Sequence, residues 1–261
     1  MRRQREQAGQ PTTQVIAVGR QQLTTATWGT GAPEIVMLHD GLGSIAQWRS
    51  VPADLANRTG RTVMAYDRAG HGSSTPVPSG PWSADWLHRE ADVLAEMLLL
   101  VGAREPILVG HSDGGSIAAI LAAVQPTSCR QLALLAAHTW VETATIREIE
   151  RMRATPDPTV SALRRYHDRP EELFEAWSGV WVSEEFARWD IRELVAGIAV
   201  PALVIQGDHD EYATDAHAFE TSGAIGSNAR PVLLPDLGHL LHHQAPDVVT
   251  ELVAGFFNQG C

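Results

Sequence analysis

One short segment constrains the fold of this 261-residue chain more than any other. In residues 106–116, an apolar run leads directly into Gly-His-Ser-Asp-Gly, and a helical stretch of small residues follows. A strand that turns this sharply into a helix strains the backbone of its central residue, Ser112, and admits only small residues two positions away. Gly110 and Gly114 occupy those two positions. The segment predicts a serine hydroxyl raised above a buried strand and facing a helix N-terminus; the alternative is an ordinary strand-helix turn.

Short apolar runs alternate with helical patterns along most of the chain. We expect strands at residues 14–18, 22–28, 34–38, 62–66, 106–109, 131–135, 202–205 and 232–234. We expect helices at residues 47–58, 83–101, 113–124 and 246–257. The first two strands alternate like an antiparallel pair, and the others have the continuous apolar character of strands covered on both faces. This order predicts an α/β fold with a mostly parallel eight-stranded sheet flanked by helices, which binds ligands at the carboxyl ends of its strands.

Residues 138–200 interrupt this alternation. They contain no clear buried strand, and they hold four of the eight tryptophans together with three prolines. We interpret them as a helical cap inserted into a core of residues 14–137 and 201–261, with residues 1–13 as a flexible tail. Trp140, Trp177 and Trp181 are expected to line an apolar substrate pocket beneath the cap; the alternative is that they only hold the cap together.

Composition narrows the classes of partner. The chain has 31 acidic and 20 basic residues, and its net charge of -11 disfavours nucleic acid and anionic membranes. It has no apolar stretch long enough to span a bilayer and no secretory signal pattern. Cys129 and Cys261 lie far apart without metal-ligand spacing. We expect a cytoplasmic protein that binds a small molecule; a homodimer and a monomer are equally compatible with the sequence.

Two further motifs supply partners for the serine. A serine hydroxyl is a poor nucleophile unless a base takes its proton and a third group orients that base. The strand near residue 204 ends in Gly-Asp-His-Asp, and Leu-Gly-His239 follows the final apolar run. Residues 67–74 also match the pattern D-x-x-G-x-G-x-S after the fourth strand. On these motifs, residues 14–258 resemble the α/β-hydrolase superfamily, in the branch with a helical cap between core strands six and seven.

The resemblance implies a catalytic triad in the chain order Ser, Asp, His. Ser112 corresponds to the nucleophile, His239 to the general base and Asp210 to the acid that orients it. Two other carboxylates are alternatives for the acid. Asp208 lies two residues earlier in the same turn, and Glu142 follows the sixth strand, where some members of the superfamily carry the acid.

An oxyanion hole requires backbone amides aimed at the developing negative charge. The amide of Asp113 follows the nucleophile and opens the next helix, so we expect it to be one donor. The second donor is expected in the loop after the third strand, which reads His-Asp-Gly where the superfamily commonly has His-Gly. Leu42 is the favoured second donor, and Gly41 is the alternative. The Asp113 carboxylate is expected to accept hydrogen bonds at the helix N-terminus.

These residues predict a serine hydrolase that cleaves a small or medium apolar carboxylic ester through an acyl-enzyme. The chemistry needs no metal and no organic cofactor, and the sequence has no phosphate loop or dinucleotide fingerprint. Carbon-carbon bond hydrolysis, lactone or thioester hydrolysis and perhydrolysis are alternatives on the same triad. A non-catalytic ligand receptor built on the same fold is an alternative of another class.

Overall fold

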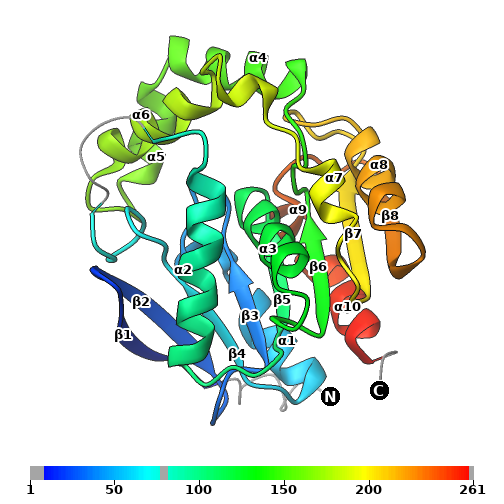
Figure 1. Cartoon of the computed structure of the whole chain (residues 1–261). Helices are drawn as coiled ribbons and strands as arrows, with labels where there is room; N and C mark the ends of the chain where they lie inside the picture. The colour runs from blue at the N-terminus through cyan, green and yellow to red at the C-terminus, as the bar shows by residue number, and fades with distance from the viewer. Residues whose placement is uncertain (1–8, 77–81, 259–261) are drawn as a thin grey trace.

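The computed structural model describes residues 9–76 and 82–258. Its strands are β1 (Thr12–Val18), β2 (Gln21–Trp28), β3 (Ile35–Leu38), β4 (Val63–Tyr66), β5 (Ile107–His111), β6 (Gln131–Leu135), β7 (Ala202–Gly207) and β8 (Ala229–Leu234). They form one sheet in the order β1-β2-β4-β3-β5-β6-β7-β8 (Figure 1). β2 runs antiparallel to both of its neighbours, and every other pair in the sheet is parallel. The expected mostly parallel eight-stranded α/β sheet is confirmed.

β3 illustrates why the sheet is covered on both faces. All four of its residues are buried. Val36 and Leu38 pack into one apolar core, and Ile35 and Met37 pack into a second core on the opposite face. Successive side chains of a strand point to opposite faces, so a continuous apolar run is stable only between two layers of helices.

The two helical layers differ in size. The face that carries Val36 and Leu38 is covered by α2 (Trp86–Leu100), α3 (Asp113–Val124), α7 (Arg192–Val195) and α8 (Ala216–Ile225). The opposite face is covered by α1 (Val51–Thr59) and α10 (Pro246–Asn258). Short helical turns lie between these elements at η2 (Ile45–Trp48), η4 (Gly226–Asn228) and α9 (Leu241–Gln244). Figure 1 shows α2 and α3 in front of the sheet, with α10 behind it.

The chain between β6 and β7 forms a helical layer over the carboxyl ends of the strands (Figure 1). Its helices are α4 (Thr143–Ala154), α5 (Asp157–Leu163), α6 (Pro170–Trp181) and η3 (Phe186–Arg188). The entering and leaving segments are joined by a β-bridge between Trp140 and Asp190 and by a 2.7 Å hydrogen bond from the Ile191 amide to the Thr139 carbonyl. This layer therefore leaves and rejoins the core at one place. α7, within the stretch expected as cap, packs against α3 and α8 of the core.

Several element boundaries differ from expectation. α1 begins at Val51 instead of residue 47, because Arg49 has a φ of 52° and separates it from the turn η2. α2 begins at Trp86, since the Ser83 hydroxyl bonds the Asp85 carboxylate and does not cap the helix. β1 begins at Thr12, inside the expected tail. The sequence patterns did not predict α8, whose apolar residues are mixed with small polar ones.

Parts of the expected termini lie outside the described residues, namely residues 1–8 of the tail and residues 259–261, which include Cys261. Cys129 is buried and free. Within the described ranges, no helix has the length and apolar character needed to cross a membrane.

Two glycine-to-alanine substitutions in helices test the tight contact beside Ser112. A Cβ at Gly114 would collide with the backbone carbonyls of Leu38 and His39, whereas a Cβ at Gly223 of α8 would meet nothing within 4 Å. We expect Gly114→Ala to lower the free energy of unfolding by about 3 kcal/mol or more, through overpacking against backbone. Gly223→Ala should raise it by roughly 0.5–1 kcal/mol, through helix propensity. Urea denaturation measures both, and equal effects would contradict the packing account.

Candidate active site

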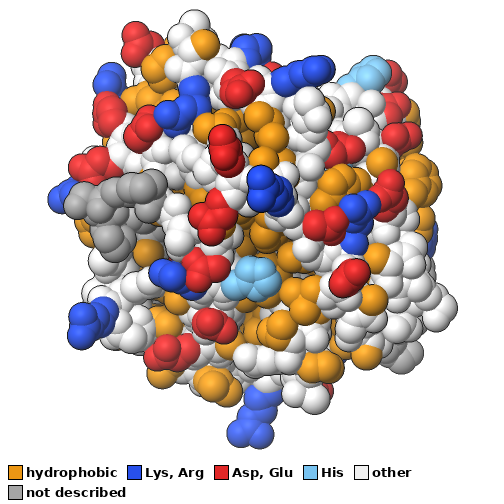
Figure 2. Space-filling model, turned by 45° about the horizontal axis from the view of Figure 1, so that its top comes forward, with side chains coloured by type: hydrophobic (Ala, Val, Ile, Leu, Met, Phe, Trp, Pro, Cys, Tyr) orange, Lys and Arg blue, Asp and Glu red, His pale blue; other side chains and the backbone are white. Residues whose placement is uncertain are grey.

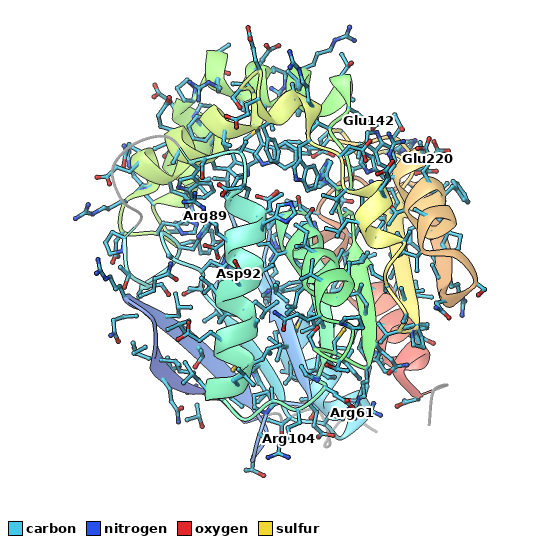
Figure 3. All side chains as sticks on the ribbon, viewed as in Figure 1. Arg61, Arg89, Asp92, Arg104, Glu142 and Glu220 are labelled. Atoms are coloured by element: carbon cyan, nitrogen blue, oxygen red, sulfur yellow. The ribbon has the colours of Figure 1, made fainter. Side chains whose placement is uncertain are left out.

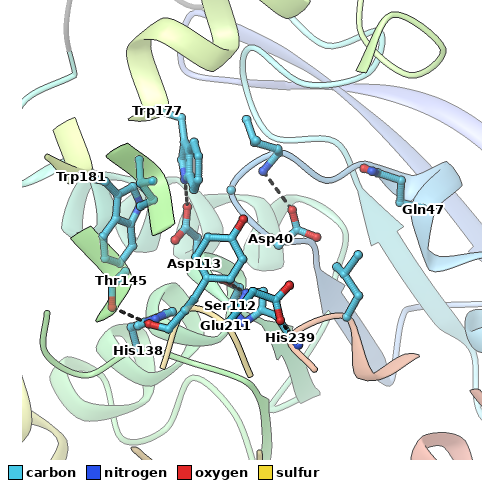
Figure 4. A pocket seen from close by; sticks show the side chains of 15 residues that line it. Asp40, Gln47, Ser112, Asp113, His138, Thr145, Trp177, Trp181, Glu211 and His239 are labelled. Atoms are coloured by element: carbon cyan, nitrogen blue, oxygen red, sulfur yellow. Dashed lines mark hydrogen bonds between the residues drawn. The ribbon is translucent and has the colours of Figure 1, made fainter. Parts of the chain in front are cut away.

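The turn between β5 and α3 holds Ser112 in an unusual conformation. Its φ is 51°, a region that residues with a side chain rarely adopt. The Ser112 amide donates a 2.8 Å hydrogen bond to the Leu135 carbonyl, and the amides of Gly115 and Ser116 donate to the Ser112 carbonyl. The backbone of the turn is thereby fixed from both sides. The Ser112 side chain lies at the wall of a cavity between the sheet and the cap layer (Figure 4).

His239 and Asp210 complete a chain of hydrogen bonds that starts at Ser112. The Ser112 hydroxyl lies 2.9 Å from Nε2 of His239, and Nδ1 of His239 lies 2.8 Å from a carboxylate oxygen of Asp210. Asp210 also accepts hydrogen bonds from the Gln206 side chain at 2.6 Å and from the Tyr212 amide at 2.8 Å. In this arrangement Nδ1–H donates to Asp210, and the lone pair of Nε2 accepts the serine proton.

The electrostatics of this group suit a base oriented by a carboxylate. Burial raises the pKa of Asp210, but the charge and hydrogen bond of His239 outweigh burial and lower the pKa to about 2. Burial lowers the pKa of His239, but the charge and hydrogen bond of Asp210 reverse this effect and leave the pKa above its ordinary value. Asp210 is therefore ionised at neutral pH, and it stabilises the protonated form of His239.

The two alternative acids lie elsewhere. Asp208 accepts a 2.7 Å hydrogen bond from the Asp236 amide. Glu142 accepts hydrogen bonds from the amide and hydroxyl of Thr214, and it lies toward Glu220 of α8 (Figure 3). Each of these carboxylates holds a turn of the backbone, whereas Asp210 bonds the ring of His239.

In the loop after β3, the amide expected as the second oxyanion donor already has a hydrogen-bond partner. The Leu42 amide donates a 2.9 Å hydrogen bond to the Asp40 carboxylate. The other oxygen of Asp40 lies 3.2 Å from Nδ1 of His111. Burial raises the pKa of Asp40, but the hydrogen bond from His111 lowers it well below its usual range. At Gly41 an added Cβ would collide with the side chains of Trp177 and Asp113, so the loop presses against both the cap and α3.

The Asp113 carboxyl contacts the cap and not the N-terminus of its own helix, which corrects the expectation from the sequence. Nε1–H of Trp177, in α6, donates a 3.0 Å hydrogen bond to this carboxyl (Figure 4). Burial raises the pKa of Asp113 to about 6, although the charge of Arg68 and the bond from Trp177 act in the opposite direction. The residue after Ser112 therefore connects the core to the cap.

The cavity above Ser112 has a volume of about 170 Å³. Trp177 and Trp181 line it as expected from the sequence, together with Ser112, Asp113, His239, Leu42 and Gly41. Other described residues also line it without having been indicated by the sequence patterns, namely Asp40, Gln47, His138, Thr145, Ile149, Glu211, Tyr212 and Leu240. Several of these follow the carboxyl ends of β3, β6 and β7, which is the signal that could have identified them.

Trp140 lies outside this lining, contrary to expectation. Its ring stacks on His217 at a centroid distance of 3.7 Å, and the guanidinium of Arg192 lies over it at 4.6 Å. These contacts hold Trp140 at the base of the cap. In the described part of the chain, no group of three or more His, Cys, Asp or Glu residues is arranged to hold a metal ion.

The sequence of residues 35–252 matches the alpha/beta hydrolase family, and the chain belongs to that family. The resemblance inferred from the motifs is thereby confirmed. The chain is an alpha/beta hydrolase whose relatives carry several different enzymatic names.

Three similar proteins illustrate this range. A serine hydrolase of Mus musculus named BPHL is 26% identical over 250 residues, which cover 92% of this chain and 84% of that protein. A non-heme haloperoxidase of Rhodococcus erythropolis is 28% identical over 245 residues, which cover 81% of this chain and 87% of that protein. The solved structure of an enol-lactonase from Burkholderia xenovorans shares the fold with a TM-score of 0.73 and 23% identity, over 94% of this chain and 100% of that one.

Asp113→Asn tests the cost of burying a carboxyl beside Ser112. The unfolded chain releases the Asp113 proton near pH 4, whereas the folded chain keeps it to about pH 6, so stability falls as pH rises through this interval. Asn keeps an oxygen for Trp177 but carries no ionisable proton. We expect the free energy of unfolding of the variant to gain roughly 2–3 kcal/mol relative to wild type between about pH 4 and about pH 7. Parallel stability profiles in urea denaturation would contradict this.

Proposed function

We propose that the protein is a serine hydrolase that cleaves carboxylic esters of small or medium acids through an acyl-enzyme on Ser112. One observation carries the proposal: the continuous hydrogen-bond chain from Ser112 through His239 to Asp210 at the wall of a small cavity. A nucleophile, its base and an orienting carboxylate in these positions are the arrangement that activates serine in acyl transfer.

In the proposed reaction, Ser112 Oγ attacks the ester carbonyl carbon while Nε2 of His239 takes the hydroxyl proton. The tetrahedral intermediate collapses, the C–O bond to the alcohol breaks, and His239 returns its proton to the leaving oxygen. Water then repeats the attack on the acyl-enzyme and releases the acid. Asp210 stays ionised throughout and stabilises the imidazolium.

The amides of Asp113 and Leu42 are the proposed oxyanion donors. Preorganised amides contribute most where charge develops in a site that excludes water. In this proposal the Leu42 amide exchanges its present partner, the Asp40 carboxylate, for the carbonyl oxygen of the substrate. Binding of an ester is thus coupled to a change in this loop.

The cavity supports a small substrate, since about 170 Å³ is enough for a short acyl group. Trp177, Trp181 and Ile149 provide apolar wall for that group. We propose that the substrate is a small molecule and that the protein acts in a reducing cytoplasm. The proposed reaction uses no cofactor, and neither nucleic acid nor a membrane is a proposed partner. Acidic and basic side chains are mixed over the cap side of the molecule in Figure 2.

Ser112→Ala provides the direct test of the proposed nucleophile. Turnover of p-nitrophenyl esters from acetate to decanoate should favour short acyl chains and fall by roughly four orders of magnitude or more in the variant. Ser222→Ala is the matched control, because Ser222 is equally buried in α8 and does not line the cavity. Ester turnover that survives in Ser112→Ala contradicts the proposal. If Ser112 is required for turnover of lactones, thioesters or a vinylogous diketone and no ester is turned over, the reaction is reassigned to that substrate class. If the protein binds these compounds but turns over none of them, the result supports a receptor.

The pH profile tests the proposed base. His239 must be neutral to accept the serine proton, so kcat/KM should fall with decreasing pH through a pKa above the ordinary value of about 6.5. Because the charge of Asp40 raises the pKa of His239, Asp40→Asn should move this acidic limb to lower pH. The control Asp208→Asn should leave it in place. An acidic limb that does not move in Asp40→Asn, or that moves upward, would contradict the assignment.

A further inference from the structure

His138, directly after β6, is buried at the wall of the cavity, with 2% of its surface exposed. Neither of its ring nitrogens has a partner in good hydrogen-bond geometry among the described residues, although the Tyr212 backbone faces the ring. Four other buried histidines near the site have partners at both ring nitrogens, namely His39, His71, His111 and His239. A buried polar group without a partner is unfavourable unless a ligand supplies one.

The charge state of His138 limits what such a ligand can be. Burial and the neighbouring His239 lower the pKa of His138 to about 4, while Asp210 and the Tyr212 backbone act in the opposite direction. The ring is therefore neutral near pH 7, and it offers one N–H donor and one lone-pair acceptor. The lining contains Asp40, Asp113 and Glu211 but, within the described residues, no lysine or arginine. An anionic group would be repelled by these carboxyl groups, and the donor and acceptor of the neutral ring match an uncharged hydroxyl or carbonyl group.

The position of His138 indicates which part of the substrate it meets. Its ring centroid lies 5.9 Å from that of His239 and 5.2 Å from that of Trp181. The His138 ring is thus a neighbour of the His239 ring, and it borders the apolar wall formed by Trp181 and Ile149. An acyl group attached to Ser112 would bring its β- or γ-carbon toward this wall. At this wall, beside Trp181 and Ile149, the ring nitrogens of His138 are available to hydrogen-bond a group of the substrate.

We propose that His138 is a specificity-determining residue that hydrogen-bonds an uncharged hydroxyl or oxo group on the acyl chain. The preferred substrates are then esters of short hydroxy or oxo acids, ahead of plain alkanoates of the same length. A site with a buried polar group selects the substrate that satisfies it, because the analogue without that group leaves it unpaired. This inference rests on the proposed ester hydrolysis and specifies its substrate class.

His217 provides a matched control in the same neighbourhood. It is also a buried histidine, and neither ring nitrogen has a partner in good hydrogen-bond geometry among the described residues, although Nε2 lies 3.5 Å from a carboxylate oxygen of Glu142. Its ring centroid lies 5.0 Å from that of His138, but it stacks on Trp140 and does not line the cavity. A general effect of buried histidines would appear in both positions, whereas recognition of a substrate would appear only at His138.

The test uses binding, so that it does not depend on turnover. Isothermal titration of the Ser112→Ala protein compares phenyl butyrate with phenyl β-hydroxybutyrate and phenyl acetoacetate. We expect at least one of the two oxygenated esters to bind about tenfold more tightly than butyrate. Adding His138→Phe should abolish this preference, and adding His217→Phe should preserve it. Equal affinities for all three esters in Ser112→Ala, or a preference that survives His138→Phe, would overturn the proposal.

A second measurement keeps His138 unchanged. In ¹⁵N-labelled Ser112→Ala protein, the ring-nitrogen signals of His138 should shift with the oxygenated ester and stay in place with butyrate; the opposite pattern overturns the proposal. Turnover of the same three esters by the protein with Ser112 intact tests the hydrolysis separately. Turnover without a binding preference contradicts the role of His138 alone. A binding preference without turnover contradicts the proposed reaction and supports the contact.

Discussion

The close approach of α3 to the end of β3 is the constraint on which the site depends. It is possible only because Gly114 has no Cβ to meet the carbonyls of Leu38 and His39. The same approach turns the chain through Ser112 with a positive φ and brings the start of α3 beside the loop that carries Leu42. The parallel sheet then delivers the segments after β7 and β8 to the same edge, where Asp210 and His239 meet Ser112.

Several polar contacts join the cap to the core, and one of them lies directly beside Ser112. Trp177 reaches down from α6 to the carboxyl of Asp113, one residue after Ser112. Burial of that carboxyl raises its pKa and opposes folding at neutral pH, so this contact with α6 is made at a cost in the free energy of unfolding. The contact orders the wall of the cavity beside the hydroxyl of Ser112. The position of the cap and the geometry around the serine are therefore linked.

Local constraints were predictable from the sequence, and through-space contacts were not. The strand-turn-helix at Ser112 and the motifs that carry Asp210 and His239 follow from short segments whose conformation is set by neighbouring residues. Trp140 was misplaced because its orientation depends on His217 and Arg192, which are distant in sequence. The partner of the Leu42 amide and the unpaired ring of His138 likewise depend on how loops from different strands pack together.

The most direct test of the central claim is covalent labelling with a fluorophosphonate, followed by mass spectrometry of the digested protein. An activated serine attacks phosphorus, releases fluoride and keeps the phosphonate, whereas ordinary serines do not react. We expect one adduct per chain, on Ser112; it should be absent when the protein is denatured before labelling, and it should form more slowly in His239→Ala. A native protein that is not labelled, or that is labelled at another residue, would contradict the account.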